Sequence, residues 1–200
     1  DAAGLSAASK CKREAPDREV IVFERGEWIS YAHCGTPYYV KGEVPGLTDL
    51  LSLRPSDVAD RGIDLRRNHE VVSISPEERV VTVEGPDGRF DQPYGDLLIA
   101  TGARAATGPI DGSHLEGAFT LHGLDDAAAI RAYLADPDAF DPDAVDESFV
   151  DRARVRVNGA LSPPDSAAIV GGGYVGIEMA EALSANGLSV HLFQRPEHVL

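Results

Sequence analysis

The stretch AAIVGGGYVGIEMAEALSANG, residues 167–187, decides the fold. Its glycines Gly171, Gly173 and Gly176 have the spacing GxGxxG, with an apolar run before them and a helical pattern after them. In such a turn the first glycine allows a sharp bend, the second lets the backbone approach a pyrophosphate, and the third lets helix pack on strand. The helix N-terminus then presents N–H groups to the phosphates. The stretch predicts a dinucleotide site; a close-packed turn without a ligand is the alternative.

The next segment, LSVHLFQR (188–195), reads as the strand that completes a βαβ unit. Gln194 lies 18 residues after Gly176, where a site specific for NAD usually has an acidic residue, and Arg195 follows it. A neutral residue beside a guanidinium removes repulsion toward a 2′-phosphate and can pair with it. We therefore expect NADPH rather than NADH to be preferred, with a merely solvated Arg195 as the alternative.

The N-terminus resembles a second copy of this pattern. In DAAGLSAASK (1–10), Gly4 takes the place of the third glycine, and residues 5–14 have a helical pattern. The apolar run EVIVFER (19–25) reads as a buried strand that brings Glu24 to a position 20 residues after Gly4. A carboxylate there can accept hydrogen bonds from the ribose hydroxyls of an adenosine. An ordinary solvent-facing glutamate is the alternative.

The remaining segments predict an α/β fold with two Rossmann-like dinucleotide-binding units, both incomplete. Strands alternating with helices imply a parallel sheet covered on both faces. Residues 40–68, after the segment around Cys34, read as polar and turn-rich. The other expected elements are strands at 70–75 and 79–85, a turn at 86–88, a segment 89–102 that ends in an apolar strand, and a helix at 124–135. We expect an FAD-binding domain at 1–123 and the start of an NAD(P)H-binding domain at 124–200, with an acidic insertion at about 136–151.

The composition narrows the possible partners. The chain has 33 acidic and 18 basic residues, a formal net charge of −15, and only three lysines. Nucleic acid and anionic membranes would be repelled. No apolar run is long enough to span a membrane and no signal peptide pattern is present, so we expect a cytoplasmic protein. The lysine-poor acidity is typical of halophiles, although an ordinary acidic protein is the alternative.

The ends of the chain predict a fragment. It begins at Asp1 rather than at a methionine, and the segment before Gly4 is too short for a first strand. It stops just after the strand predicted at 188–195. We expect an N-terminal strand and a downstream part to be missing.

One of the two cysteines stands in a distinctive context. In SYAHCGTPYY (30–39), Cys34 precedes Gly35 and Pro37, residues that can open a helix, and a helix N-terminus favours the thiolate anion. The neighbouring His33 could add to this effect or point away. Cys11 lies within the helical stretch SAASKCKRE and reads as a small packing residue. Cys34 is therefore the candidate redox thiol.

Four segments together resemble the pyridine nucleotide-disulfide oxidoreductases: DAAGLSAAS, VIVFER, LLIATGA (97–103) and IVGGGYVGIEMAEAL. Around Cys34 the chain is similar to the single-cysteine branch, which contains coenzyme A-disulfide reductases, NADH oxidases and peroxidases, and persulfide reductases. The dithiol branch has a CxxxxC pair, and here Tyr39 stands at the second position. The resemblance therefore implies a single redox thiol.

The resemblance also assigns roles to individual residues. It implies that Gly4 and Glu24 hold the adenosine diphosphate part of FAD. The turn residues Ala100, Thr101 and Gly102 would pass close to the flavin. The nicotinamide cofactor's pyrophosphate would be held by Gly171, Gly173 and Gly176. Tyr174 and Glu178 match positions near the flavin ring and the nicotinamide; the alternatives are a packing aromatic and a first-turn acid favoured by the helix dipole.

The implied activity is that of an FAD-dependent NAD(P)H oxidoreductase with Cys34 as its redox thiol. Its electron acceptor would be a disulfide such as coenzyme A disulfide, or a persulfide, oxygen or peroxide. The family's C-terminal interface domain completes the active site in a homodimer and lies outside these 200 residues, so this stretch alone is not expected to be a complete enzyme. Two alternatives are a ferredoxin reductase-type electron carrier in which Cys34 is incidental, and a non-enzymatic nucleotide-binding redox sensor.

Overall fold

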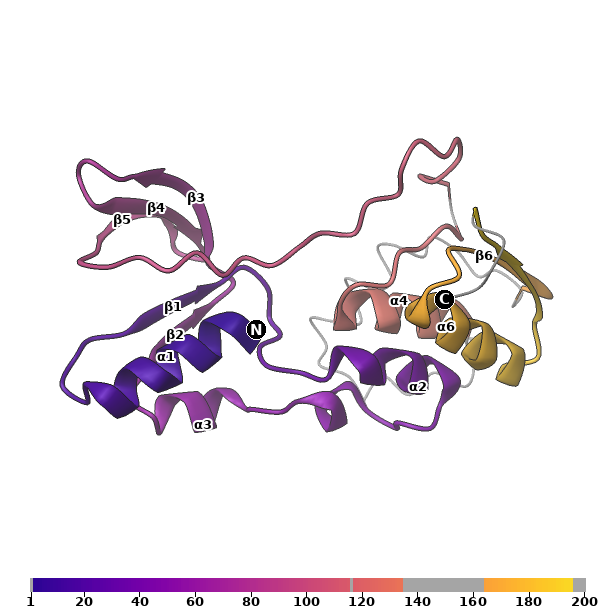
Figure 1. Cartoon of the computed structure of the whole chain (residues 1–200), viewed down its shortest axis with the longest axis horizontal. Coiled ribbons are helices and arrows are strands. Elements are labelled where there is room, and N and C mark those ends of the chain that lie inside the picture. The colour runs from indigo at the N-terminus through magenta and orange to yellow at the C-terminus, as the bar shows by residue number, and fades with distance from the viewer. Residues whose placement is uncertain (1, 116, 135–163, 196–200) are drawn as a thin grey trace. The chain divides into compact units, whose positions relative to one another are not determined.

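The computed structural model describes residues 2–115, 117–134 and 164–195; the acidic insertion predicted at 136–151 lies outside them. The elements, shown in Figure 1, are α1 (Ala2–Glu14), β1 (Ile21–Glu24), η1 (His33–Gly35), α2 (Thr36–Lys41), η2 (Leu47–Leu50), α3 (Pro55–Ala59), β2 (Asp64–Arg67), β3 (Glu70–Ser75), β4 (Val80–Gly85), β5 (Gly88–Pro93), α4 (Leu124–Leu134), β6 (Ser166–Val170), α6 (Tyr174–Ala185) and β7 (Ser189–Phe193). The chain divides into two compact units, Asp1–Tyr31 with Leu51–Ala103 and Ala32–Leu50 with Arg104–Leu200.

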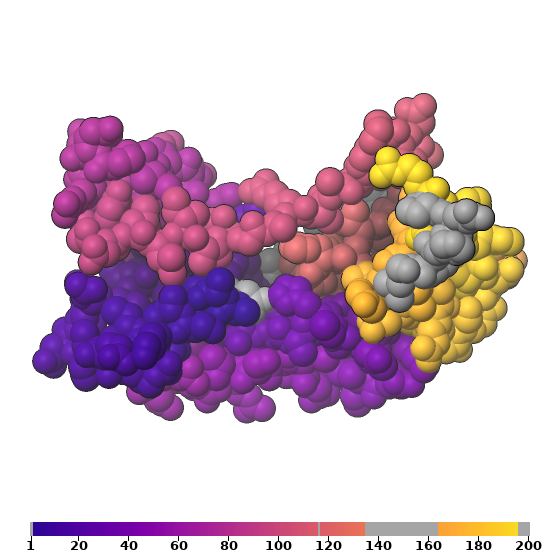
Figure 2. Space-filling view, in the orientation of Figure 1, coloured from indigo at the N-terminus to yellow at the C-terminus, as the bar shows by residue number. Residues whose placement is uncertain are grey.

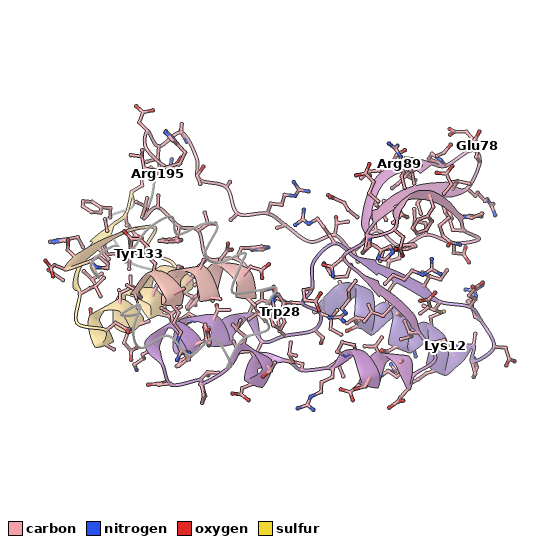
Figure 3. All side chains as sticks on the ribbon, turned by 180° about the vertical axis from the view of Figure 1, so that it is seen from behind. Lys12, Trp28, Glu78, Arg89, Tyr133 and Arg195 are labelled. Atoms are coloured by element: carbon pink, nitrogen blue, oxygen red, sulfur yellow. The ribbon has the colours of Figure 1, made fainter. Side chains whose placement is uncertain are left out.

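The first unit is built around the parallel strand pair β1 and β2, in which Ile21 faces Asp64 and Glu24 faces Arg67. Helix α1 contacts β1, and α3 contacts β2. Apolar side chains from these elements and their connections form one core: Leu5, Ala8, Ile29, Val58 and Ile63. At the C-terminal end of α1, the amine of Lys12 donates hydrogen bonds to the carbonyl oxygens of Pro16 and Arg18, at 2.6 and 3.0 Å (Figure 3). The helix end is thus closed by a cation, as the helix dipole favours.

Strands β3, β4 and β5 form a separate antiparallel sheet in the first unit. The turn between β4 and β5 reaches Gly88, whose φ of 114° lies in the region that glycine adopts without strain. One face is well covered, since Val81 and Val83 on β4 are 2% and 0% exposed. The rings of Phe23, His69 and Phe90 contact one another in tilted or edge-on arrangements, at centroid distances of 6.0 to 6.3 Å, so this sheet packs on the end of β1.

The second unit contains α2, α4, α6 and the parallel pair β6 and β7. Helix α2 contacts both α4 and α6, and α6 contacts both strands (Figure 1). The buried side chains include Val40, Leu124 and Ala182, each 1% exposed. By contrast, Val170 and Phe193 at the ends of the strands are 67% and 57% exposed; this part of the unit is orange to yellow in Figure 2.

Most predicted elements are confirmed, including the helix at 5–14 and the strands at 19–25, 70–75, 79–85 and 188–195. The apolar strand predicted at the end of 89–102 is wrong. Strand β5 ends at Pro93, residues 97–102 form no strand, and Leu98 and Ile99 are each 64% exposed. An apolar run becomes a buried strand only between neighbouring strands, and no described strand pairs with these residues.

Two broader expectations also need correction. The stretch 40–68 is not merely turn-rich, because it contains the 3₁₀ turn η2, helix α3 and strand β2. The predicted sheet covered on both faces is not formed by the described residues, where the strands make two parallel pairs and one antiparallel sheet. Across the described ranges, no helix combines the length and the apolar character that crossing a bilayer requires.

Candidate functional site

The glycine turn between β6 and α6 has the geometry that its sequence predicts. The φ of Gly171 is 116°, which a residue with a side chain rarely adopts. A Cβ on Gly176 would overlap the carbonyl oxygen of Gly171, so the third glycine lets α6 approach the turn closely. A Cβ on Gly173 would meet no atom within 4 Å. The space above Gly173 is therefore open for a ligand that lies against the backbone.

The N-terminus of α6 can supply hydrogen-bond donors to an anion. Its N-cap, Gly173, makes no side-chain capping bond. In the described part of the chain, the first-turn N–H groups of Tyr174, Val175 and Gly176 have no protein acceptor, and the first bond of the helix runs from the N–H of Ile177 to the oxygen of Gly173 at 3.0 Å. Open backbone and unpaired donors at a helix N-terminus are what a pyrophosphate needs.

Gln194 and Arg195 follow the end of β7. The Gln194 side chain lies so close to Gly172 that a Cβ there would overlap its Oε1. Arg195 is exposed (Figure 3). The amide of Gln194 therefore lies beside the glycine turn, and the guanidinium of Arg195 follows it in the sequence.

Cys34 is exposed and lies in the 3₁₀ turn η1, which runs directly into α2. The turn is fixed by its neighbours: the hydroxyl of Thr36 donates to the carbonyl oxygen of His33 at 2.7 Å, and a Cβ on Gly35 would overlap the side chain of Leu50. Pro37 lies in the first turn of α2, as predicted. The thiol is therefore exposed in a turn that a hydrogen bond and a close packing contact hold at the start of a helix. Cys11, predicted to be a packing residue, is half-buried in α1.

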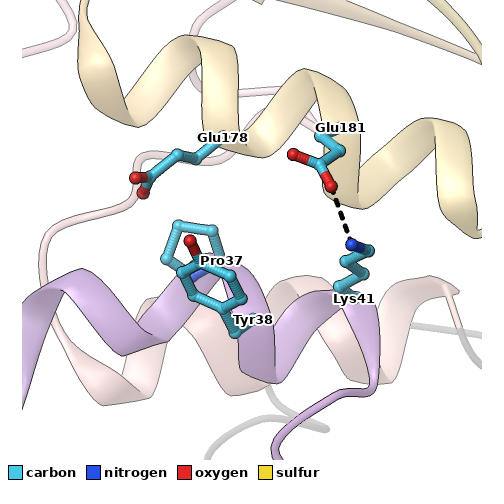
Figure 4. Close-up of a pocket in the computed structure, with 5 residues that line it drawn as sticks. All are labelled: Pro37, Tyr38, Lys41, Glu178 and Glu181. Carbon is cyan, nitrogen blue, oxygen red and sulfur yellow. Dashed lines mark hydrogen bonds and ion pairs between the residues drawn. The ribbon is translucent and has the colours of Figure 1, made fainter.

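Helices α2 and α6 meet at a small pocket. Its walls are Pro37, Tyr38 and Lys41 on α2 and Glu178 and Glu181 on α6 (Figure 4). The Lys41 amine lies 2.7 Å from Oε1 of Glu181 and 2.6 Å from Oε1 of Glu43, and hydrogen bonds to Glu181 and Glu43 raise the pKa of Lys41 above its usual range. The structure thus brings Glu178 to the helix that follows Cys34.

Tyr174, the first residue of α6, is 75% exposed. It is therefore not the packing aromatic that the alternative interpretation required. An exposed ring beside an open glycine turn can cover a ligand and can move aside.

The predicted FAD residues lie in the first unit. Gly4 is in the first turns of α1, where a Cβ would lie 3.5 Å from the Cβ of Ala100. Thr101 and Gly102 follow in an exposed segment, with a φ of 68° at Gly102. Glu24 ends β1, and its Oε1 accepts a hydrogen bond from the N–H of Gly26 at 2.8 Å. This bond holds the carboxylate at the strand end, the place where the sequence predicts that it binds an adenosine ribose.

A second pocket, of about 260 Å³, lies in the first unit and was not predicted. Its polar walls are Ser6, Ser9 and Arg13 on α1, together with Ser30 and Arg61. The Arg61 guanidinium donates to the hydroxyl of the buried Ser9 at 2.8 Å. Two guanidinium groups and several hydroxyls suit an anionic group such as a phosphate. One signal was present in the sequence, because Ser6, Ser9 and Arg13 share one face of a helix.

Two further side chains near Cys34 have shifted pKa values. The partial burial of its ring, and then the charge of His122, lower the pKa of His33; the two rings are 6.2 Å apart. Burial raises the pKa of Tyr39, and Arg131 opposes this rise. Within the described ranges, no group of three or more His, Cys, Asp or Glu side chains is arranged to hold a metal ion.

Comparisons with known proteins agree with this geometry. Residues 1–200 match the model of the family described as pyridine nucleotide-disulphide oxidoreductase. A curated relative from Pyrococcus abyssi, an NAD(P)H sulfur oxidoreductase (CoA-dependent), is 38% identical over all of this chain and 39% of its own length. A coenzyme A disulfide reductase from Staphylococcus haemolyticus is 29% identical over 99% of the chain and 39% of its own length.

Solved structures of related reductases are also similar to this chain. The reduced CoADR-RHD of Bacillus anthracis is 29% identical, with a TM-score of 0.79, and the match covers 99% of this chain and 31% of that one. An NAD-dependent persulfide reductase from A. fulgidus is 28% identical, with a TM-score of 0.78, over 96% of this chain and 32% of that one. These matches confirm the predicted α/β fold. The chain spans about two fifths of the length of the curated relatives, 39% in each of the two above.

Proposed function

The chain belongs to the pyridine nucleotide-disulphide oxidoreductase family, and from this premise we propose that it is part of an FAD-dependent NAD(P)H oxidoreductase that reduces a phosphate-bearing disulfide or persulfide through Cys34. The observation that carries the proposal is that Cys34 is exposed in the turn at the start of α2. Helix α2 packs against α6, the helix that follows the GxGxxG turn. The names of the relatives, CoA-dependent sulfur oxidoreductase and coenzyme A disulfide reductase, support this class of acceptor.

We assign the nicotinamide cofactor to the turn before α6. The open backbone at Gly171 and Gly173 would hold its pyrophosphate, with Gly176 allowing the close approach of the helix. Tyr174 would cover the site, and Glu178 would lie near the nicotinamide. The neutral Gln194 and the exposed Arg195 favour a 2′-phosphate, and hence NADPH.

We assign FAD to the first unit. Glu24 would bind the adenosine ribose, and α1 at Gly4 would face the pyrophosphate, with Ala100 in contact distance of Gly4. Thr101 and Gly102 would run beside the ring system. When bound, the flavin supplies the two-electron step, taking a hydride from the reduced nicotinamide and delivering an electron pair to sulfur. The domain boundaries, 1–123 for FAD and 124–200 for NAD(P)H, stay a prediction.

Cys34 would act as the nucleophile. Its thiolate attacks one sulfur of the substrate disulfide, so that one S–S bond breaks, a mixed disulfide forms, and the released thiolate takes up a proton. Two-electron reduction of the mixed disulfide would then regenerate the Cys34 thiolate and release the second thiol after protonation. The chain contributes position and exposure: η1 presents the sulfur, and no second cysteine competes for it at Tyr39.

The pocket lined by Arg13 and Arg61 in the first unit supports the choice of a phosphate-bearing acceptor. Its volume of about 260 Å³ is just below the roughly 300–1,000 Å³ typical of pockets that enclose a drug-sized ligand. It would therefore hold a phosphate-bearing group rather than a whole drug-sized ligand.

The test compares acceptors and cysteines in the intact protein. Oxidation of NADPH and NADH is followed with coenzyme A disulfide, a persulfide, oxygen and peroxide, in wild type, Cys34→Ser and the control Cys11→Ser. We expect turnover with coenzyme A disulfide or the persulfide to be lost in Cys34→Ser and kept in Cys11→Ser. Undiminished turnover in Cys34→Ser would instead favour the electron carrier of ferredoxin reductase type, and absence of flavin would favour a redox sensor. The homodimer, the cytoplasmic location and the halophilic source stay predictions.

A further inference from the structure

Helix α2 is too short to hold its own position. It spans six residues, and helices of this length are not stable in water without tertiary contacts. Its C-terminal end is closed by Gly42, with a φ of 93°, and the carbonyl oxygens of that end carry the negative pole of the helix. Whatever anchors this end also limits the motion of the turn that carries Cys34, because η1 and α2 are continuous.

Arg131 on α4 provides such an anchor. Its Nη1 donates hydrogen bonds to the carbonyl oxygens of Tyr39, Val44 and Pro45, at 3.1, 3.1 and 3.2 Å. These oxygens belong to the last turn of α2 and to the segment that leaves it. A cation at this position is favoured by the helix dipole, and bonds from a charged donor are stronger than neutral ones.

The same guanidinium lies over the ring of Tyr39, with its central carbon 4.4 Å from the ring centroid. Tyr39 is 5% exposed, so this contact is largely removed from water and is worth more than a surface contact. A lysine ammonium could donate to the same carbonyl oxygens, but it lacks the planar group that lies over the Tyr39 ring. The geometry therefore calls for an arginine.

Helix α4 also reaches the other end of the segment. His122, just before α4, lies with its ring 6.2 Å from that of His33. The carboxylate of Asp126 accepts hydrogen bonds from the N–H groups of His122 and Gly123, at 2.9 and 3.2 Å, which fixes this turn to α4. The segment from His33 to Pro45 is thus contacted near its end by Arg131 of α4 and lies near its start beside His122, in the turn that precedes α4.

We propose that Arg131 is a positioning residue for Cys34: it ties the C-terminal end of α2 to α4 and so fixes the turn that presents the thiol. The inference rests on the proposed redox role of Cys34, although the anchoring itself does not depend on that role. Arg131 does not touch the reacting atoms. Its effect is on where the sulfur lies, and how long it stays there.

The test measures the mobility of the Cys34 side chain directly. In the intact protein with Cys11→Ser, a nitroxide label is attached to Cys34 and its electron paramagnetic resonance spectrum is recorded with Arg131, Arg131→Lys or Arg131→Ala. Arg89→Ala, which removes an exposed arginine on β5, is the matched control. We expect the label's rotational correlation time to shorten by about twofold or more in Arg131→Ala, less in Arg131→Lys, and not in Arg89→Ala.

A second measurement uses the unlabelled protein. We expect Arg131→Ala to lower kcat for the disulfide by about tenfold while KM for the reduced nicotinamide stays unchanged. Unchanged label mobility in folded Arg131→Ala, or in Arg131→Lys should the alanine variant not fold, would overturn the inference even if the melting temperature fell. The label experiment needs neither acceptor nor turnover, so it gives its answer even if Cys34→Ser shows that the proposed function is wrong.

Discussion

The guanidinium of Arg61 donates a hydrogen bond to the hydroxyl of Ser9 over 2.8 Å, although 52 residues separate them. Ser9 is 5% exposed, so the bond holds Arg61 against the pocket whose other cation is Arg13. The pocket is therefore assembled by the fold of the first unit and has its charges in place before a ligand arrives.

Arg13→Gln tests this pocket. Loss of one charged hydrogen bond to a phosphate should raise KM for coenzyme A disulfide by about tenfold or more, because such bonds are worth roughly 1.5–3 kcal/mol. A small disulfide without phosphates should be reduced equally well by wild type and variant. Steady-state kinetics with both acceptors measure the difference. Equal effects on the two acceptors would mean that Arg13 does not bind phosphate.

Gly173→Ala tests the nicotinamide site. A methyl group there meets no atom within 4 Å, and the φ of −77° suits alanine, so the fold should be unaffected. The methyl would occupy the space assigned to the pyrophosphate, and KM for NADPH should rise by about tenfold or more. Gly95→Ala, also with no atom within 4 Å, is the matched control. Similar KM values in the two variants would remove the turn from the cofactor site.

Arg195→Ala tests the preference for NADPH. The variant should lose about tenfold in kcat/KM with NADPH and little with NADH, because only NADPH has a 2′-phosphate. The preference of the wild type should also weaken as salt is raised, since Arg195 is exposed. Arg89→Ala is again the control. Equal losses with both cofactors, or none, would show that Arg195 is merely solvated.

The His33 ring makes stability depend on pH. Its pKa in the folded protein is lowered by partial burial and by His122, so the unfolded chain binds a proton first as the pH falls. The contribution of neutral His33 is complete above about pH 6.5 and is lost as the pH falls below that value. Because His33 is largely exposed, solvent screening keeps the effect below about 1 kcal/mol.

The measurement compares thermal unfolding at pH 7.5 and pH 5.5. His33→Asn should lose less stability than wild type on going to the lower pH, whereas His191→Asn, a change at an exposed position on β7, should behave like wild type. An identical loss in wild type and His33→Asn would show that the His33–His122 pair has no part in acid sensitivity.

The sequence predicted the structure best where neighbouring residues alone determine the backbone conformation. The turn at Gly171 and Gly176 could be predicted because backbone geometry itself demands those glycines. Strand β2 could not, because its polar sequence DLRR becomes a strand only through pairing with β1. The exposed run at Leu98 and Ile99 misled for the opposite reason, since apolar composition predicts a buried strand but does not supply the neighbours that bury it.

The candidate site also has parts that local sequence predicts and parts that it does not. Cys34, its turn and the start of α2 at Thr36 follow from neighbouring residues in the sequence. The partners that reach this segment from elsewhere, such as Arg131, lie about ninety residues away and carry no local signal. Long-range contacts of this kind are decided by packing, which single-sequence patterns do not record.

Asn186 ends α6, and its side-chain amide donates both to Ala182 at 2.8 Å within that helix and to the carbonyl oxygen of Val40 on α2 at 3.1 Å. One amide thus closes the last turns of both helices. The two should therefore open together when the native state fluctuates, and amide hydrogen exchange in α2 should follow the rate of α6 rather than that of α3, which is nearer to α2 in the sequence. In kinetic terms, the helix after the cysteine belongs to the same cooperative unit as the helix that begins at the glycine turn.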